Sequence, residues 1–379
     1  MLVKLRTCAR VMLATSTALV WIAQLSVADA VPVASNGPVS SEGAPDLVPL
    51  IRVPRLAYVT ETATSTSQVW LASASGGERK LLGPGDQPLL APNGQSVAVS
   101  LFGASPGVVE HGPSIGIYSA SGAPLADYLD LETATATPLA WSPDSRYLAV
   151  YRQSTETVDI AQGSGLDVID TQTGTVTSIA AGAIYGASFA RDGSDRLVFG
   201  LSHSESFSGG VNLYMSAAGG AGLHRITDDG RSLNPVWGAS YIAYDRERMR
   251  HEAPEYQIWL TSPSGTRVRK VTHVAVGPLV EGLVPLAFSA DASRLLAELE
   301  GQDTSGAYAV NVASGRARSV TVHGRSVLGA GISSDGSTLL VDENAFEEPP
   351  SNGRVATIPF TGGRPHVLVA HGSQASWNG

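Results

Sequence analysis

The sequence predicts an all-β fold, a seven-bladed β-propeller, and three observations predict it. A motif of a large apolar residue, a polar turn and an apolar run recurs along the 379 residues, as in "WSPDSRYLAV" from Trp141. The apolar runs follow one another at steps of about 41 to 53 residues, which is the range of propeller blades. The last repeat stops at the point where the first repeat lacks a strand, so the two ends complement each other.

The apolar run is the first element of each repeat. Each run is short and bounded by turn residues, which is typical of a buried strand. We expect this strand to be the innermost one of its blade. The seven runs are "LAYV" from Leu56, "VAVS" from Val97, "LAVY" from Leu148, "LVFG" from Leu197, "IAYD" from Ile242, "LLAE" from Leu295 and "LLVD" from Leu339.

Three further strands follow in each repeat. The second and third strands are separated by a short glycine hairpin, where glycine is favoured because such turns need positive φ. The hairpins are Ser75-Gly76-Gly77, Ser121-Gly122, Thr173-Gly174, Gly219-Gly220, Ser264-Gly265, Ser314-Gly315 and Gly362-Gly363. The fourth strand, which we expect to be outermost, carries the large apolar residue of the next motif. These residues are Leu90, Trp141, Phe189, Trp237, Phe288, Ile332 and Trp377.

The two ends of the chain predict how the blades close into a ring. The strand at Ala375–Trp377 has no repeat after it, and "RLAYV" from Arg55 has no turn before it. We expect these two strands to pair, so that every blade has four antiparallel strands and no sheet edge is left at the junction. In the recurring turn, the aromatic residue is expected to pack between blades while Pro, Asp and Gly or Ser shape the turn. The motif is therefore interpreted as architectural.

The repeats carry a family resemblance. "WSPDSRYLAVY" and "ISSDGSTLLV" resemble the TolB-type, WD40-like propeller repeat of exported bacterial proteins, and the resemblance covers about residues 55–379. It implies a β-propeller and indicates little about activity. TolB proper has six blades behind an N-terminal α/β domain, whereas this sequence predicts seven blades and leaves only residues 31–54 before them. The propellers of oligopeptidases carry similar repeats beside a hydrolase domain for which this sequence has no room.

The N-terminal segment predicts export. Residues 1–30 have a basic start, an apolar stretch and small residues at Ala28 and Ala30, as in a cleaved signal peptide. A retained signal anchor is the alternative interpretation of the same pattern. Residues 31–54 are rich in Pro, Ser, Gly and Ala, which predicts a flexible leader. We expect an extracellular or periplasmic protein with no transmembrane segment in the mature chain.

Composition narrows the classes of partner. The formal charge of −9 and the absence of a basic run argue against nucleic acid. The only cysteine, Cys8, lies in the predicted signal, so the mature chain has no thiolate metal site and no internal disulfide. No cofactor and no metal site are predicted, and a monomer is expected.

A binding surface is expected where the loops are long. These loops follow the apolar runs, at residues 61–68, 103–114, 153–165, 202–210, 246–256, 301–306 and 344–352. Polar residues at the ends of the runs could converge on the mouth of the central channel and bind a peptide, a small ligand or a hard cation. The alternative is a solvated rim of mutually paired charges. The candidate residues are Arg152, Asp245, Arg246, Glu298, Glu300, Asp342 and Glu343.

Three other sequence patterns are candidates for a functional site. The charged stretch "RERMRHEAPEY" at 246–256 is predicted to be a loop, either docking a partner or merely solvated. Gly112–Gly116 is a literal G-x-S-x-G, but Ser114 precedes a strand rather than a helix, which argues against a nucleophile. His203 and His251 lie in neighbouring long loops and leave a histidine metal site open without a spacing rule to support it.

These observations favour a non-enzymatic binding or scaffold module. We expect it to bind a protein, a peptide or an envelope component through the long-loop face, with no catalytic residues. The alternative is a propeller enzyme, a lyase or hydrolase with a metal or carboxylate site at the channel mouth. A structural surface protein without a ligand is a third possibility.

Overall fold

All regular structure in the described residues is β-strand, so the predicted all-β class is confirmed. The computed structural model describes residues 54–61, 67–101, 113–130, 134–154, 163–203, 210–250, 253–275, 280–301, 304–345 and 353–378. They all belong to the compact unit Leu50–Gly379. The predicted signal and all of the leader except Pro54 lie outside the described residues. No helix in the described ranges is long and apolar enough to cross a membrane.

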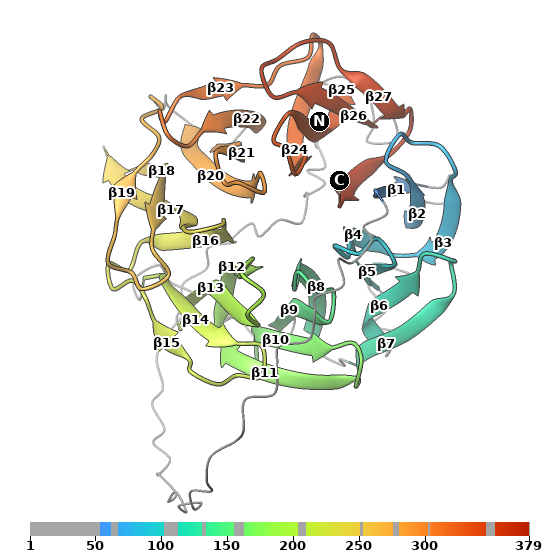
Figure 1. Ribbon diagram of the computed structural model, residues 1–379, viewed down its shortest axis with the longest axis horizontal. Helices are drawn as coiled ribbons and strands as arrows, with labels where there is room; N and C mark the ends of the chain where they lie inside the picture. Colours follow the sequence, from blue (N-terminus) through green and yellow to red (C-terminus); the bar gives the residue numbers. More distant parts are fainter. Residues whose placement is uncertain are drawn as a thin grey trace, which may run out of the picture. The chain divides into compact units, whose positions relative to one another are not determined.

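The strands form antiparallel sheets that follow one another around a ring (Figure 1). Within the described residues, five sheets have four strands each, and a larger sheet joins two four-stranded units. We call each four-stranded unit a blade and number the blades along the chain. Blade 1 joins Ser373–Trp377 to the strands of Arg55–Pro84, and blade 2 holds the strands of Asp86–Asp130. Blades 3 to 7 hold the strands of Ala134–Ala181, Ala183–Arg225, Ser232–Lys270, Val280–Ser319 and Arg325–Val369.

Each blade contains strands in four positions, from the centre of the ring outwards. The innermost strands are β28 (Ser373–Trp377), β4 (Asp86–Leu90), β8 (Ala134–Trp141), β12 (Ala183–Phe189), β16 (Ser232–Trp237), β20 (Val280–Phe288) and β24 (Arg325–Ile332). The second strands are β1 (Arg55–Glu61), β5 (Ser96–Ser100), β9 (Tyr147–Ser154), β13 (Arg196–Ser202), β17 (Ile242–Arg250), β21 (Arg294–Gly301) and β25 (Thr338–Ala345).

The outer half of each blade holds the remaining strands. The third strands are β2 (Ser67–Ser73), β6 (Pro113–Ser119), β10 (Gly165–Asp170), β14 (Asn212–Ala217), β18 (Ala253–Thr261), β22 (Gly306–Asn311) and β26 (Arg354–Pro359). The outermost strands are β3 (Lys80–Pro84), β7 (Pro124–Asp130), β11 (Thr175–Ala181), β15 (His224–Arg225), β19 (Arg269–Lys270), β23 (Ala317–Ser319) and β27 (His366–Val369).

The innermost strand is not the one expected from the sequence. The apolar runs form the second strands, and the strands before the turns lie nearest the centre (Figure 1). Neighbouring innermost strands contact one another, as β12 does with β16 and β28 with β4. A second strand has strands on both edges and blades on both faces, so it is the most completely buried strand. Its apolar sequence marks this burial and not a central position.

The first and last strands of the unit lie side by side. β1 pairs with β28 in antiparallel register, with Leu56 opposite Trp377 and Ala57 opposite Ser376. The Asn378 side chain adds a hydrogen bond from the Arg55 backbone amide, 2.8 Å from the Asn378 oxygen. Closure of the complete ring through this pairing remains a prediction.

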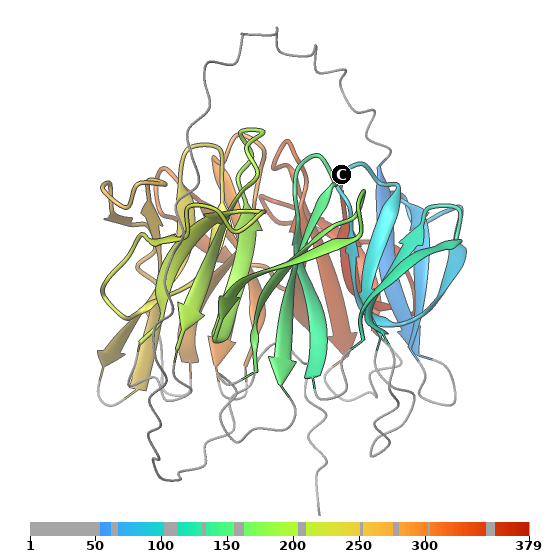
Figure 2. The ribbon, with the colours of Figure 1, turned by 90° about the horizontal axis from the view of Figure 1, so that it is seen from below.

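The two faces of the ring differ in their connections (Figure 2). The turn face carries the recurring polar turns and the glycine hairpins. In every predicted hairpin at least one glycine has positive φ, and the first such glycine of each hairpin has a value between 69° at Gly315 and 93° at Gly362, which confirms the reason for glycine there. The opposite face, here called the loop face, is where second strands end and third strands begin.

The core lies between blades as well as within them. Trp237 is 2% exposed and packs with Val198 of blade 4 and Tyr244 of blade 5. Trp141 donates its indole N–H to the Leu89 carbonyl oxygen of the preceding blade, at 2.9 Å. The prediction that the aromatic residue of the motif packs between neighbouring blades is therefore confirmed.

Candidate functional site

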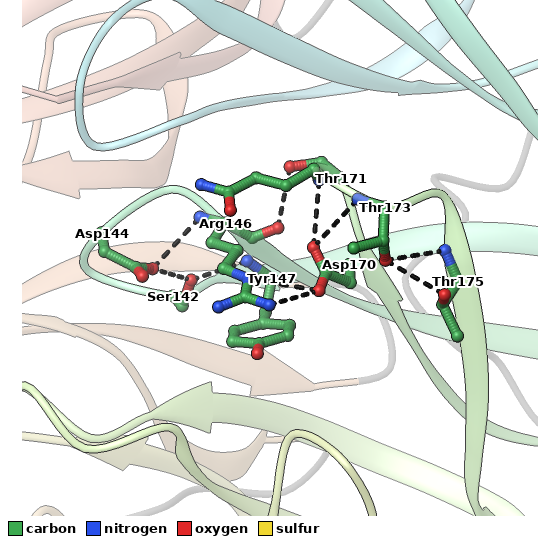
Figure 3. Close-up of polar contacts among 9 residues, drawn as sticks. Ser142, Asp144, Arg146, Tyr147, Asp170, Thr171, Thr173 and Thr175 are labelled. Atoms are coloured by element: carbon green, nitrogen blue, oxygen red, sulfur yellow. Dashed lines mark hydrogen bonds and ion pairs between the residues drawn. The ribbon is translucent and has the colours of Figure 1, made fainter.

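The recurring turn is held by its own side chains, as Figure 3 shows for blade 3. Ser142 Oγ lies 2.5 Å from Asp144 Oδ1, which also accepts the Arg146 backbone N–H at 3.1 Å. Ser142 Oγ in turn accepts the Tyr147 backbone N–H at 2.8 Å. The Arg146 guanidinium reaches Asp170 on β10 at 2.7 Å, which ties the turn to the glycine hairpin beside it. All these groups are used within the blade, which supports the architectural interpretation.

Three of the predicted site residues form ion pairs, two with a residue of their own blade and one with the connection between β15 and β16. The pairs are Arg152 with Asp167 at 2.9 Å, Arg246 with Asp229 at 2.7 Å, and Glu343 with Arg354 at 2.6 Å. Arg246 also lies over the Trp259 ring, 4.9 Å from its centroid. Each of the three follows the apolar run at the same position, so the alternation of the strand turns their side chains the same way. For Arg152, Arg246 and Glu343 the structure therefore agrees with the alternative hypothesis, in which the polar residues form mutually paired charges.

The preceding position of the second strand faces the next blade. It holds Asp245 in β17, Glu298 in β21 and Asp342 in β25. Asp342 accepts the backbone N–H of Ala375 on β28, which is 3.2 Å from Oδ2. At the same position of β5, Ser100 donates to the Ala136 carbonyl oxygen on β8 at 2.9 Å. This position therefore links a second strand to the innermost strand of the following blade.

Asp245 is the exception in this series. Asp245 is 1% exposed, and within the described part of the chain neither of its carboxylate oxygens has a hydrogen bond of ordinary geometry. Loss of solvent, reinforced by the charges of Glu300 and Glu247, raises the pKa of Asp245 to about 7, and a hydrogen bond from the Asn234 side chain opposes the shift. A buried carboxyl group without a partner is costly in its charged form, so Asp245 is the unusual group of this region.

Tyr256 on β18 lies beside the same carboxylates. Its pKa is raised first by burial and then by the charges of Glu247, Asp245, Glu281 and Glu300. Burial also raises the pKa of Glu247; the cation Arg231 lowers that value and Glu281 raises it. Of the seven predicted site residues, the structure brings Asp245 and Glu300 within electrostatic reach of each other, and Tyr256, Glu247 and Glu281 join them.

A second feature of the ring was missed by the sequence analysis. Gln87, Asn234 and Gln374 have positive φ of 51°, 45° and 52°, an uncommon conformation for residues other than glycine. Each lies on an innermost strand, three residues before the large apolar residue of the motif. The Gln87 backbone N–H donates to Gln374 Oε1 at 2.6 Å, which joins β4 to β28. An amide residue three positions before the large apolar residue of the motif was the available signal.

The prediction that residues 246–256 form a loop is wrong. β17 continues to Arg250 and β18 begins at Ala253, with Glu247 opposite Tyr256 and Arg248 opposite Glu255. Opposite charges across the two strands support the extended form, so a charged stretch need not be a loop. Residues 251 and 252 lie outside the described residues, as do large parts of the other predicted long loops.

The other sequence candidates have ordinary surroundings where they are described. Ser114 is buried in β6, and its carbonyl oxygen accepts the Leu101 backbone N–H at 2.9 Å. The His203 ring lies edge-on to Tyr214, with 6.3 Å between centroids, and His251 is outside the described residues. In the ranges that the structure describes, no three His, Cys, Asp or Glu residues are placed to hold a metal ion.

Comparison with solved structures shows what class of fold these sheets form. The β-propeller domain of the trilobed protease from Pyrococcus furiosus matches with a TM-score of 0.60 and 11% identity, over 84% of this chain and 94% of that one. A prolyl endopeptidase matches with a TM-score of 0.58 and 13% identity, over 83% of this chain and 48% of that one. The chain thus spans about half the length of that peptidase.

TolB from Acinetobacter baumannii is also among the similar structures. It matches with a TM-score of 0.49 and 15% identity, over 86% of this chain and 83% of that one. No family model matches the sequence, and no curated protein matches it. The predicted β-propeller is confirmed by these comparisons, and at such low identities they show the fold alone.

Proposed function

We propose that the chain is a non-enzymatic binding or scaffold module that takes a protein or peptide partner on its loop face. The feature that supports this proposal is the hairpin of β17 and β18, which we call the loop-face hairpin (Glu247–Tyr256). β16 pairs with β17 only as far as Arg246, opposite Ser232. Within the described residues, Arg248 to Arg250 pair only with β18, so the hairpin extends as a two-stranded ribbon.

The loop-face hairpin presents groups that suit a protein partner. The Met249 side chain is 53% exposed, and methionine adapts well to apolar contacts at binding surfaces. Arg248 beside it is exposed and lies opposite Glu255. The backbone edge of Arg248–Arg250 offers hydrogen-bonding groups to an added strand, which is a common mode of peptide recognition. A single exposed apolar residue is ordinary, but here it stands beside an open strand edge.

Site-specific photocrosslinking tests this proposal. A photoreactive phenylalanine analogue is placed at Met249 and, as the matched control, at Thr266 in a glycine hairpin on the turn face. In extracts of the native host we expect a discrete adduct at position 249 that excess unlabelled wild-type protein competes away. The unlabelled double variant Arg248→Glu, Met249→Ser should compete at least tenfold less well. The same adducts from positions 249 and 266, or equal competition by both proteins, would contradict binding at the loop-face hairpin.

A further inference from the structure

The junction between blades 5 and 6 contains a direct backbone contact between strands of the two blades. Tyr256 on β18 pairs in parallel with Gly282 on β20, which joins the two blades into one sheet. Gly282 has φ of 140°, and a Cβ atom there would lie 2.0 Å from the Tyr256 carbonyl oxygen. The two backbones are therefore in direct contact at this point.

Carboxylates flank this contact on both sides. Glu247 lies opposite Tyr256 across β17 and β18, and Glu300 lies opposite Gly282 across β20 and β21. The row Glu247, Tyr256, Gly282 and Glu300 thus crosses four strands in register. Asp245 precedes Glu247 by two residues on β17, so the two side chains point to the same face. Glu281 precedes Gly282 on β20.

The charges around Asp245 are of one sign. Glu300 of β21 and Glu247 of β17 act on it, and Asn234 of β16 is the neutral group that opposes them. Tyr256 of β18 and Glu281 of β20 complete the cluster. Arg231 acts on Glu247, while Arg246 of β17 pairs with Asp229. The largest charge effects on Asp245 come from Glu300 and Glu247, and both raise its pKa.

We propose that Asp245 is a proton-operated switch of the junction between blades 5 and 6. Protonated, its carboxyl group is neutral, carries a donor and can remain buried among Glu247, Tyr256, Glu281 and Glu300. Ionised, it is a buried charge that lies beside other negative charges and whose oxygens have no hydrogen bond of ordinary geometry, so the state in which β18 and β20 separate and water reaches Asp245 is favoured. The pKa of about 7 places the change within the range that an exported protein encounters.

Thermal unfolding and hydrogen exchange between pH 5 and 9 test the switch. For the wild-type protein we expect the melting temperature to fall from pH 5 to about 7 and to level off above that pH. In this range the unfolded carboxyl group has already lost its proton, whereas the folded state still binds one. Amide exchange in 242–260 and 280–288 should quicken at least tenfold more than exchange in the matched blade 3 segments 134–154. The isosteric Asp245→Asn variant should lose this pH dependence, and its amides in these segments should exchange slowly relative to the blade 3 segment at both pH 5 and pH 9.

If the Asp245→Asn variant folds poorly, two further measurements test the switch. Glu300→Gln removes a neighbouring charge, so it should move the midpoint of the transition to lower pH without abolishing it. Identical pH profiles for wild type and Glu300→Gln, or for wild type and Asp245→Asn, would overturn the proposal. So would a rise in melting temperature on adding 1 mM Ca²⁺ or Mn²⁺ at pH 8 in wild type alone, since a metal would then be the missing partner.

Discussion

The carboxylate of Asp342 holds the backbone of Ala375, with 3.2 Å between Oδ2 and the amide nitrogen. The contact joins β25 of blade 7 to β28, the innermost strand of blade 1. The last strand of the chain is thus fixed on two sides, by β1 through strand pairing and by Asp342 through its side chain. The carboxylate is half-buried, and its two oxygens lie 3.3 and 3.2 Å from the Ala375 amide nitrogen.

Replacing Asp342 by Ala should lower the free energy of unfolding by about 1 to 3 kcal/mol, because the Ala375 amide loses its acceptor in a buried place. Chemical denaturation with an unchanged m-value would measure it. Asp228→Ala, at an exposed aspartate, is the control and should change stability by less than about 0.5 kcal/mol. Equal effects of the two substitutions would show that the contact adds nothing.

Removing Ala375–Gly379 should destabilise the protein far more than removing residues 31–50. The first deletion takes away Ala375–Trp377 of β28 and exposes an edge of β1, whereas the second removes only part of the predicted leader. We expect a fall in melting temperature of about 10 °C or more for the first deletion. Comparable melting temperatures for the two truncated proteins would argue against closure of the ring by these strands.

Substitution of Gly282 by Ala should disrupt the junction between blades 5 and 6. The added methyl group would lie 2.0 Å from the Tyr256 carbonyl oxygen at a φ that favours glycine, so a cost of roughly 3 kcal/mol is expected. Gly306→Ala is the matched control, since a Cβ there meets nothing within 4 Å. Denaturation curves compare the two variants. A Gly282 variant as stable as the Gly306 variant would mean that β18 and β20 need not touch.

The aspartates of the recurring turns should contribute stability that is lost in acid. Hydrogen bonds from Ser289 and Ser333 lower the pKa values of Asp291 and Asp335 to about 2, below the ordinary 3.8. A lowered folded-state pKa adds stability above about pH 4, and this contribution disappears as pH falls through about 2. The Asp291→Asn, Asp335→Asn variant should therefore approach the wild-type stability as the pH is lowered from 5 to 2.

Asparagine is a suitable replacement in that experiment because Asn93 already occupies the corresponding place in the turn after β4. Its Oδ1 accepts the Gln95 backbone N–H at 2.8 Å. The geometry of the turn should survive, and only the charge is removed. Thermal unfolding at several pH values measures the difference. A gap between variant and wild type that stays constant with pH would mean that the turn aspartates act without their charge.

The sequence by itself determined the repeated strands, the hairpins and the turns of this protein. The glycines at 76, 122, 174, 220, 265, 315 and 362 all have positive φ, and Trp141 bonds across blades. These features depend on residues close together in the chain, where turn chemistry and alternation leave few options. The charged hairpin at 246–256 is the local exception, since opposite charges paired across strands keep it extended.

Only the tertiary structure decided which strand is innermost and which polar residues meet. Alternation within one strand turns Asp245 and Arg246 to opposite sides, so neighbours in sequence have different partners. Arg246 pairs with Asp229 in the connection just before its own blade, whereas Asp245 faces a blade that begins 35 residues later, at Val280. A carboxyl group's surroundings come from strands distant in sequence, and its burial and charge depend on them. Sequence could therefore propose Asp245, but only the packing of blades 5 and 6 showed it buried without a partner.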